Sequence, residues 1–108
     1  MTEQTKSKIE QAIQQNPVMV FMKGTPEFPQ CGFSAATVDC LEQLGAQFAA
    51  LNVLEDQDVR EGIKEFSSWP TIPQVYIQGE FIGGCDITRQ MYANGELKTK
   101  LEGAGALG

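Results

Sequence analysis

Cys31 stands where an extended segment gives way to a helix, at the start of the tetrapeptide Cys31-Gly32-Phe33-Ser34. The apolar run 18–22 precedes it, and Lys23 directly follows that run. Unpaired backbone N–H groups at a helix start, the helix dipole and a nearby ammonium all favour a thiolate. Together they lower a cysteine pKa of about 8.5 to between about 3.5 and 7.5. We therefore expect Cys31 to be a reactive thiol.

No residue of the chain is placed in sequence to act together with that sulfur. A dithiol oxidoreductase has a second cysteine three positions after the nucleophile, where this sequence has Ser34. The chain has 3 cysteines and no histidine, which excludes a Cys–His pair, a His-ligated zinc site and imidazole catalysis within it. Either an external thiol resolves a disulfide formed at Cys31, or the sulfur ligates a metal. Both alternatives require a partner from solution.

The composition restricts the class of partner. A formal charge of −6 with only 8 Lys and Arg argues against a nucleic acid or an anionic membrane surface. No apolar run approaches the roughly 20 residues that span a bilayer, and the first residues resemble neither a secretory signal nor an Arg-rich transit peptide. We expect one domain over residues 1–108 in a soluble, reducing compartment, with residues 103–108 as a frayed tail.

Hydrophobic periodicity predicts the elements that position Cys31. In chain order we expect a helix over 5–15, a strand over 18–22, a helix from 34 that Gly45 ends, a strand over 48–53, and a helix capped by Asp56 or Asp58 with a buried stripe of Val59, Ile63 and Phe66. A hairpin of strands 73–77 and 81–82 follows, then a helix capped by Asp86, an interruption at Asn94-Gly95, and a last helical segment over 96–101.

This order of elements is that of an α/β chain with a thioredoxin-like fold, a four-stranded mixed sheet flanked by helices. In such a fold the loop after the first strand, the turn Trp69-Pro70-Thr71-Ile72-Pro73 and the turn Gly83-Gly84-Cys85-Asp86 converge at one edge of the sheet. Cys31 would lie among them.

Four segments together carry a resemblance to a known family. They are Lys23-Gly24-Thr25-Pro26, Pro29-Gln30-Cys31-Gly32-Phe33-Ser34, Trp69-Pro70-Thr71-Ile72-Pro73 and Gly83-Gly84-Cys85-Asp86. In this order and spacing the sequence resembles the CGFS-type monothiol glutaredoxins over nearly its whole length.

The resemblance implies that the chain binds glutathione beside Cys31 and, as a homodimer, holds a bridging [2Fe–2S] cluster. The number of ligands agrees, because such a cluster commonly needs four thiolates; two copies of Cys31 and two glutathione thiolates supply them. The resemblance further implies iron–sulfur cluster delivery to acceptor proteins and a role in iron homeostasis. A BolA-type partner and poor general disulfide reductase activity are also implied.

The same resemblance assigns the glutathione contacts. Lys23 and Arg60 match the positions that hold the glycyl carboxylate, while Gly84, Cys85 and Asp86 match the turn that receives the γ-glutamyl end. Thr71 and Ile72 would pair with the peptide backbone of glutathione, as an added strand would. Gly32, Phe33 and Pro73 complete the predicted site, and the Ile72–Pro73 bond is expected to be cis.

Several of these residues also have an ordinary structural explanation. Lys23 could be a solvated lysine at a strand end, and Arg60 and Lys64 could be charges on a solvent-exposed helix face. We expect Trp69 to be a packing residue. Cys40 lies next to the buried stripe of its helix, so we expect a structural role for it. Cys85 could form a disulfide with Cys31, become glutathionylated, or contact glutathione through its backbone.

Three functions remain open from the sequence. The first is a carrier of a labile [2Fe–2S] cluster ligated by Cys31 and glutathione. The second is a weak enzyme, a glutathione-dependent oxidoreductase that removes glutathione from protein mixed disulfides with Cys31 as the nucleophile. The third is an adaptor that forms a cluster-bridged heterodimer with a BolA-type protein. The expected location is a bacterial cytoplasm, with the mitochondrial matrix or plastid stroma as the alternative for a mature form.

Overall fold

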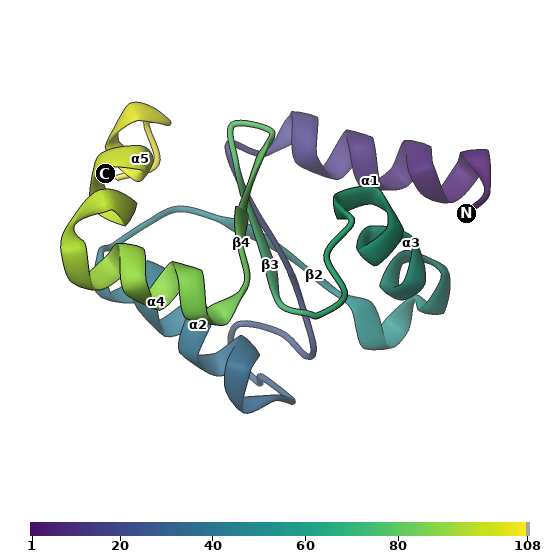
Figure 1. The fold of residues 1–108 in the computed structure, drawn as a ribbon, viewed down its shortest axis with the longest axis horizontal. Helices are drawn as coiled ribbons and strands as arrows, with labels where there is room; N and C mark the ends of the chain where they lie inside the picture. The colour runs from purple at the N-terminus through teal and green to yellow at the C-terminus, as the bar shows by residue number, and fades with distance from the viewer. Residues whose placement is uncertain (108) are drawn as a thin grey trace.

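One mixed sheet of four strands organises the chain, in the order β2-β1-β3-β4 (Figure 1). The structure is a computed structural model, and it describes residues 1–107. Strand β1 (Val18–Met22) pairs in parallel with β2 (Ala49–Asn52) and antiparallel with β3 (Gln74–Ile77). Strand β4 (Glu80–Gly83) completes an antiparallel hairpin with β3. The expected mixed sheet and hairpin are confirmed.

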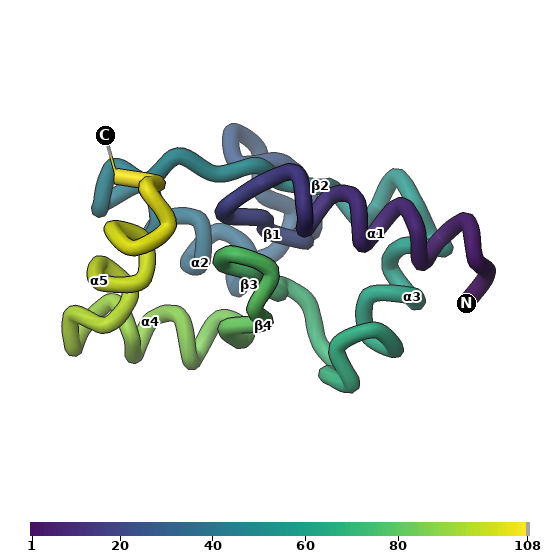
Figure 2. Tube along the Cα trace, turned by 90° about the horizontal axis from the view of Figure 1, so that it is seen from above, coloured from purple at the N-terminus to yellow at the C-terminus, as the bar shows by residue number. Residues whose placement is uncertain are grey.

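Helices cover both faces of this sheet (Figures 1 and 2). One face carries α1 (Glu3–Gln15) and α3 (Gln57–Ser67), while the other carries α2 (Gly32–Gln43), α4 (Cys85–Asn94) and α5 (Glu96–Gly103). A short 3-10 helix, η1 (Val53–Glu55), links β2 to α3. Within residues 1–107, no helix combines the length and the apolar character needed to cross a bilayer.

Strand β1 is buried on both faces because its side chains alternate between two cores. Val18, Val20 and Met22 pack with side chains of α2, α4 and α5, and Met19 and Phe21 pack with α1 and α3. Each fully buried side chain of this size stabilises the fold by roughly 1.5–3 kcal/mol. The segment that leads to Cys31 therefore starts from a strand that is held in place by burial on both faces.

Helix starts differ in part from the sequence-based expectation. Cys31 is the N-cap residue of α2, as expected from its place at a helix start, and the helix begins at Gly32, two residues before the apolar periodicity does. Asp56 caps α3 as expected, since its carboxylate accepts a hydrogen bond from the Val59 N–H at 3.1 Å. The expectation that Asp86 caps α4 is wrong. Gly84 is the N-cap residue there, and Asp86 lies inside the first turn.

The C-terminal segment is docked rather than frayed over residues 104–107, so the expectation for these residues is wrong. Ala106 is buried, and its carbonyl accepts a hydrogen bond from the Gln47 N–H at 2.8 Å. Leu107 forms an isolated bridge with Ala46 and packs against the core. Gly105 makes this path possible because its φ of +68° lies in the left-handed region. Gly108 lies outside the described residues.

Candidate functional site

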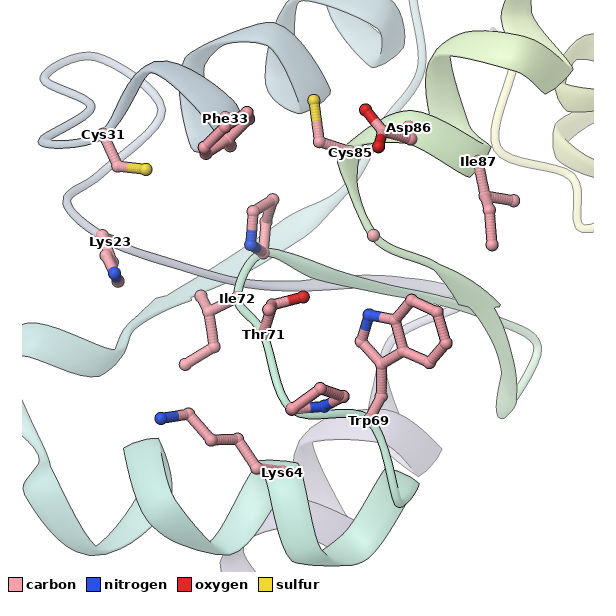
Figure 3. Close-up of a pocket in the computed structure, with 13 residues that line it drawn as sticks. Lys23, Cys31, Phe33, Lys64, Trp69, Thr71, Ile72, Cys85, Asp86 and Ile87 are labelled. Carbon is pink, nitrogen blue, oxygen red and sulfur yellow. The ribbon is translucent and has the colours of Figure 1, made fainter.

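A cavity of 410 Å³ opens beside Cys31 at one edge of the sheet (Figure 3). Its walls come from the end of β1, the start of α2, one face of α3, the loop before β3 and the start of α4. The fold thus brings together segments that are distant in the sequence, as expected from the order of elements. The lining residues are Lys23, Cys31, Phe33, Lys64, Trp69, Pro70, Thr71, Ile72, Pro73, Gly84, Cys85, Asp86 and Ile87.

Hydrogen bonds fix the backbone between β1 and Cys31. The Lys23 N–H donates to the Ser34 hydroxyl at 3.1 Å, and the Gln30 N–H donates to the Lys23 carbonyl at 2.9 Å. The Gly24 N–H donates to the Asn52 side-chain oxygen at 2.9 Å. A Cβ at Gly24 would lie 2.5 Å from the Gln30 nitrogen, and its φ is +91°, so the loop requires glycine there. These hydrogen bonds therefore fix the position of the Lys23 backbone relative to the start of α2, where Cys31 lies.

The Cys31 thiol is half-buried at the first turn of α2. Its pKa is lowered chiefly by the Ser34 backbone N–H, with further lowering from the Phe33 N–H, the Lys23 ammonium and the Ser34 hydroxyl. Partial burial opposes these effects. The direction agrees with the expectation from the sequence, because amides at a helix start stabilise a thiolate.

The other two cysteines differ from Cys31 in their surroundings. Burial raises the pKa of the Cys40 thiol, with smaller contributions from the neighbouring Asp39 and Cys85, and this supports the expected structural role of Cys40. Cys85 lines the cavity and is buried, but its sulfur points toward α2 rather than toward Cys31 (Figure 3). All three thiols are free in the structure.

Charged groups lie on opposite sides of the cavity. The ammonium groups of Lys23 and Lys64 extend into the same side, whereas Asp86 lies on the other side at the start of α4 (Figure 3). The Lys64 side chain is 32% exposed, and its only ion pair in the described part of the chain is a distant one, 3.8 Å from Glu61. Amides at the N-terminus of α4 add donors beside Asp86. The cavity thus has a cationic end and an end with a carboxylate and N–H groups.

The loop before β3 forms the wall between these two ends. The Ile72–Pro73 peptide bond is cis, as the resemblance implied. A Cβ at Gly84 would lie 3.2 Å from the Pro73 carbonyl oxygen, so a glycine lets the start of α4 approach this loop closely. The Trp69 ring packs on Phe81 with centroids 6.0 Å apart and is 38% exposed. Trp69 therefore both packs, as expected, and lines the cavity.

The cavity includes most of the predicted site residues and adds four others. Gly32 and Arg60 are the predicted residues that do not line it. Gly32 is exposed at the first residue of α2, and Arg60 is half-buried on α3, one turn before Lys64. The lining residues that were not predicted from the sequence are Lys64, Trp69, Pro70 and Ile87. Arg60 and Lys64 are four residues apart and so lie on one helix face. This spacing could have indicated that Lys64 belongs to the site, since Arg60 was already assigned to it.

A metal centre at Cys31 would need ligands from outside the chain. Among the described residues, no group of three or more His, Cys, Asp and Glu side chains converges in a way that could hold a metal ion. The half-buried Cys31 thiol offers a single sulfur at the edge of a cavity that has room for a small molecule with further ligands.

Comparison with known proteins identifies similar sequences and folds. The glutaredoxin family model matches residues 18–82. Mitochondrial monothiol glutaredoxin-5 of Lachancea kluyveri is 59% identical over 110 residues, covering 99% of this chain and 77% of the relative. The solution structure of reduced poplar apo GrxS14 has a TM-score of 0.81 at 50% identity, covering 92% of this chain and 91% of its own. A crystal structure of a buckwheat glutaredoxin–glutathione complex has a TM-score of 0.87 at 27% identity, covering 100% of both chains.

Proposed function

Because the chain belongs to the glutaredoxin family as a monothiol member, we propose that its cavity binds glutathione next to Cys31. The observation that carries this proposal is the charge pattern of the cavity. Lys23 and Lys64 lie on one side, and Asp86 with the first amides of α4 lies on the other. Glutathione has a carboxylate at one end and an amino-acid group, carboxylate and ammonium, at the other. Its thiol lies between these ends, and Cys31 lines the same cavity next to Lys23.

Each end of glutathione then has a defined set of partners. The glycyl carboxylate pairs with Lys23 and Lys64, with Arg60 as a further cation on the same helix. The γ-glutamyl carboxylate accepts from amides at the start of α4, and Asp86 accepts from its ammonium. The backbone of Thr71 and Ile72 meets the peptide, in the manner of an added strand.

We further propose that two copies of the chain, with two glutathione molecules, carry a [2Fe–2S] cluster as cargo. The donor set fits, since each chain presents one half-exposed sulfur with a lowered pKa and, within residues 1–107, no metal-binding group of its own. Two Cys31 thiolates and two glutathione thiolates make the four that such a cluster needs. Release to an acceptor protein is favoured because half of these ligands are exchangeable.

This activity places the protein in iron–sulfur cluster assembly and iron homeostasis, with acceptor proteins and a BolA-type protein as partners. A bacterial cytoplasm and an organelle remain the two proposed locations. The relative from Lachancea kluyveri is named as mitochondrial.

The test combines glutathione binding with anaerobic reconstitution. Calorimetry should show one glutathione per chain, and iron, sulfide and glutathione together should give a brown dimer with visible absorbance. Cys31→Ser should fold and form no such dimer, whereas Cys40→Ser, a buried cysteine outside the cavity, should form it normally. Equal cluster binding by Cys31→Ser would refute the ligand assignment.

The lowered pKa of Cys31 favours a second, weaker function as a monothiol oxidoreductase. The Cys31 thiolate attacks the glutathione sulfur of a protein–glutathione disulfide, and the protein thiolate leaves and takes up a proton. A second glutathione thiolate then attacks the glutathione sulfur on Cys31, which yields glutathione disulfide and regenerates the Cys31 thiolate. Turnover of a glutathionylated protein measures this activity. Negligible turnover despite normal glutathione binding would exclude catalysis as the main role.

A further inference from the structure

Gln74 is a buried polar side chain at the first residue of β3, an interior strand of the sheet, and it is 0% exposed. Its amide nitrogen donates to the Trp69 carbonyl at 3.1 Å and to the Thr71 carbonyl at 3.2 Å. Its amide oxygen accepts from the Tyr76 hydroxyl at 3.1 Å. Both N–H groups and the oxygen are thus satisfied, which a buried amide requires if it is not to destabilise the fold.

The carbonyls that Gln74 binds belong to the loop that forms one wall of the cavity. Trp69 is held from its other side as well, because its N–H donates to the Ser67 hydroxyl at 3.1 Å and to the Lys64 carbonyl at 3.2 Å. The hydrogen bond from the buried Gln74 amide occupies the Thr71 carbonyl. Of the two residues expected to pair with the peptide, Ile72 then keeps its carbonyl for that purpose.

Tyr76 supports the amide from the opposite direction. The Tyr76 hydroxyl donates to the Gln74 amide oxygen. A tyrosine is protonated at neutral pH in any case, and burial raises the pKa of Tyr76 further, to about 12. Its ring packs among Phe21, Phe66 and Phe81. Phe81 in turn packs on Trp69. The core thus satisfies the amide oxygen of Gln74, while its amide nitrogen alone holds the loop carbonyls of the cavity wall.

We infer that Gln74 is a positioning residue, which holds the Trp69–Thr71 loop in the shape that receives glutathione without touching it. This inference rests on the proposed glutathione site. A ligand that pairs with a loop already in its bound shape does not lose affinity to loop ordering. Gln74 does not line the cavity, and the groups that set the pKa of Cys31, the α2 amides, the Ser34 hydroxyl and Lys23, do not include it. Its loss should thus weaken binding and leave the thiol unchanged.

Two variants of the full chain remove the contacts in different ways. Gln74→Met has nearly the same shape and cannot donate either of the two hydrogen bonds to the loop carbonyls. Gln74→Asn keeps an amide but is shorter by one carbon–carbon bond, about 1.5 Å, and cannot reach both carbonyls. Tyr76→Phe is the matched control for a purely structural effect, since it removes one hydrogen bond of the same network and leaves both loop carbonyls bound. Gln14→Met on α1 controls for the substitution itself.

Trp69 is the only tryptophan in the chain, so its emission reports directly on this wall. We expect Gln74→Met and Gln74→Asn to weaken glutathione binding about tenfold, as expected for losing hydrogen bonds that order the loop. They should also red-shift the Trp69 emission and leave the pKa of Cys31 as in the wild type. Tyr76→Phe should lower Tm yet keep the emission and, within about twofold, the affinity.

The inference is overturned if a folded Gln74→Asn protein binds glutathione with wild-type affinity and has the wild-type Trp69 emission. It is also overturned if Tyr76→Phe and Gln74→Met lose affinity in proportion to their loss of Tm, because the effect would then be general destabilisation. If the wild type itself fails to bind glutathione, the proposed function fails. The Trp69 emission without ligand still decides in that case whether Gln74 holds the loop.

Discussion

Replacing Lys64 by Met removes a charge from the cavity wall while keeping most of the side-chain length. The Lys64 ammonium extends into the same side of the cavity as Lys23 and has only a weak partner, Glu61 at 3.8 Å (Figure 3). We therefore expect its main role to be toward an anionic ligand. The variant should bind glutathione more weakly and fold normally.

The size of the effect follows from the exposure of Lys64. A charge pair 4 Å apart is worth about 4 kcal/mol at an effective dielectric constant of about 20. With the Lys64 side chain 32% exposed, solvent and salt screen most of this, which leaves about 1 kcal/mol. That corresponds to about a fivefold higher Kd for glutathione at low salt, and to a smaller difference at 1 M salt.

Isothermal titration at two salt concentrations measures this effect. Lys98→Met, at an exposed position of α5, should bind like the wild type. Arg60→Met is the informative comparison, because Arg60 was assigned to the same carboxylate by resemblance but does not line the cavity. Wild-type affinity of Lys64→Met at low salt would refute the reasoning. A larger loss in Arg60→Met than in Lys64→Met would contradict the structural assignment.

Two further predictions concern the thiols and the loop before Cys31. The rate at which iodoacetamide alkylates Cys31 should reach its maximum at a lower pH than for an ordinary thiol, because the pKa of Cys31 is lowered. Cys40 should react more slowly at neutral pH, because its pKa is raised. Mass spectrometry of quenched samples in which Cys40 was modified first would contradict this. Asn52→Ala should lower the free energy of unfolding in urea by about 1–2 kcal/mol, since the N–H groups of Gly24 and Leu54 lose their shared acceptor, while Asn52→Asp, which keeps an acceptor oxygen, should lose less.

Hydrophobic periodicity predicted the sheet and the helices that cover it, because the residues buried between them are mainly apolar. The run 18–22 is apolar throughout, and β1 is buried on both faces. The position of Cys31 at a helix start could likewise be predicted, since it depends only on the neighbouring strand and helix. The cavity walls followed from the order of elements, which places the ends of several segments at one edge of the sheet.

What the sequence could not predict depends on contacts between distant segments. Lys64 was taken as a solvated charge because a charged residue on a helix face has the same pattern whether it faces water or a cavity. The C-terminal segment was expected to fray because chain ends are often poorly ordered. It docks through one hydrogen bond with Gln47 and the burial of Ala106. Gln74 appeared in the sequence only as part of a β-prone run, although it bonds to two loop carbonyls.

The mass of the protein after anaerobic reconstitution with iron, sulfide and glutathione tests the central claim most directly. Native mass spectrometry should detect two chains, two glutathione molecules and one [2Fe–2S] cluster in a single complex. The same complex should be missing when glutathione is left out or when Cys31 is replaced by Ser. A cluster held by a single chain, or by two chains without glutathione, would contradict the account.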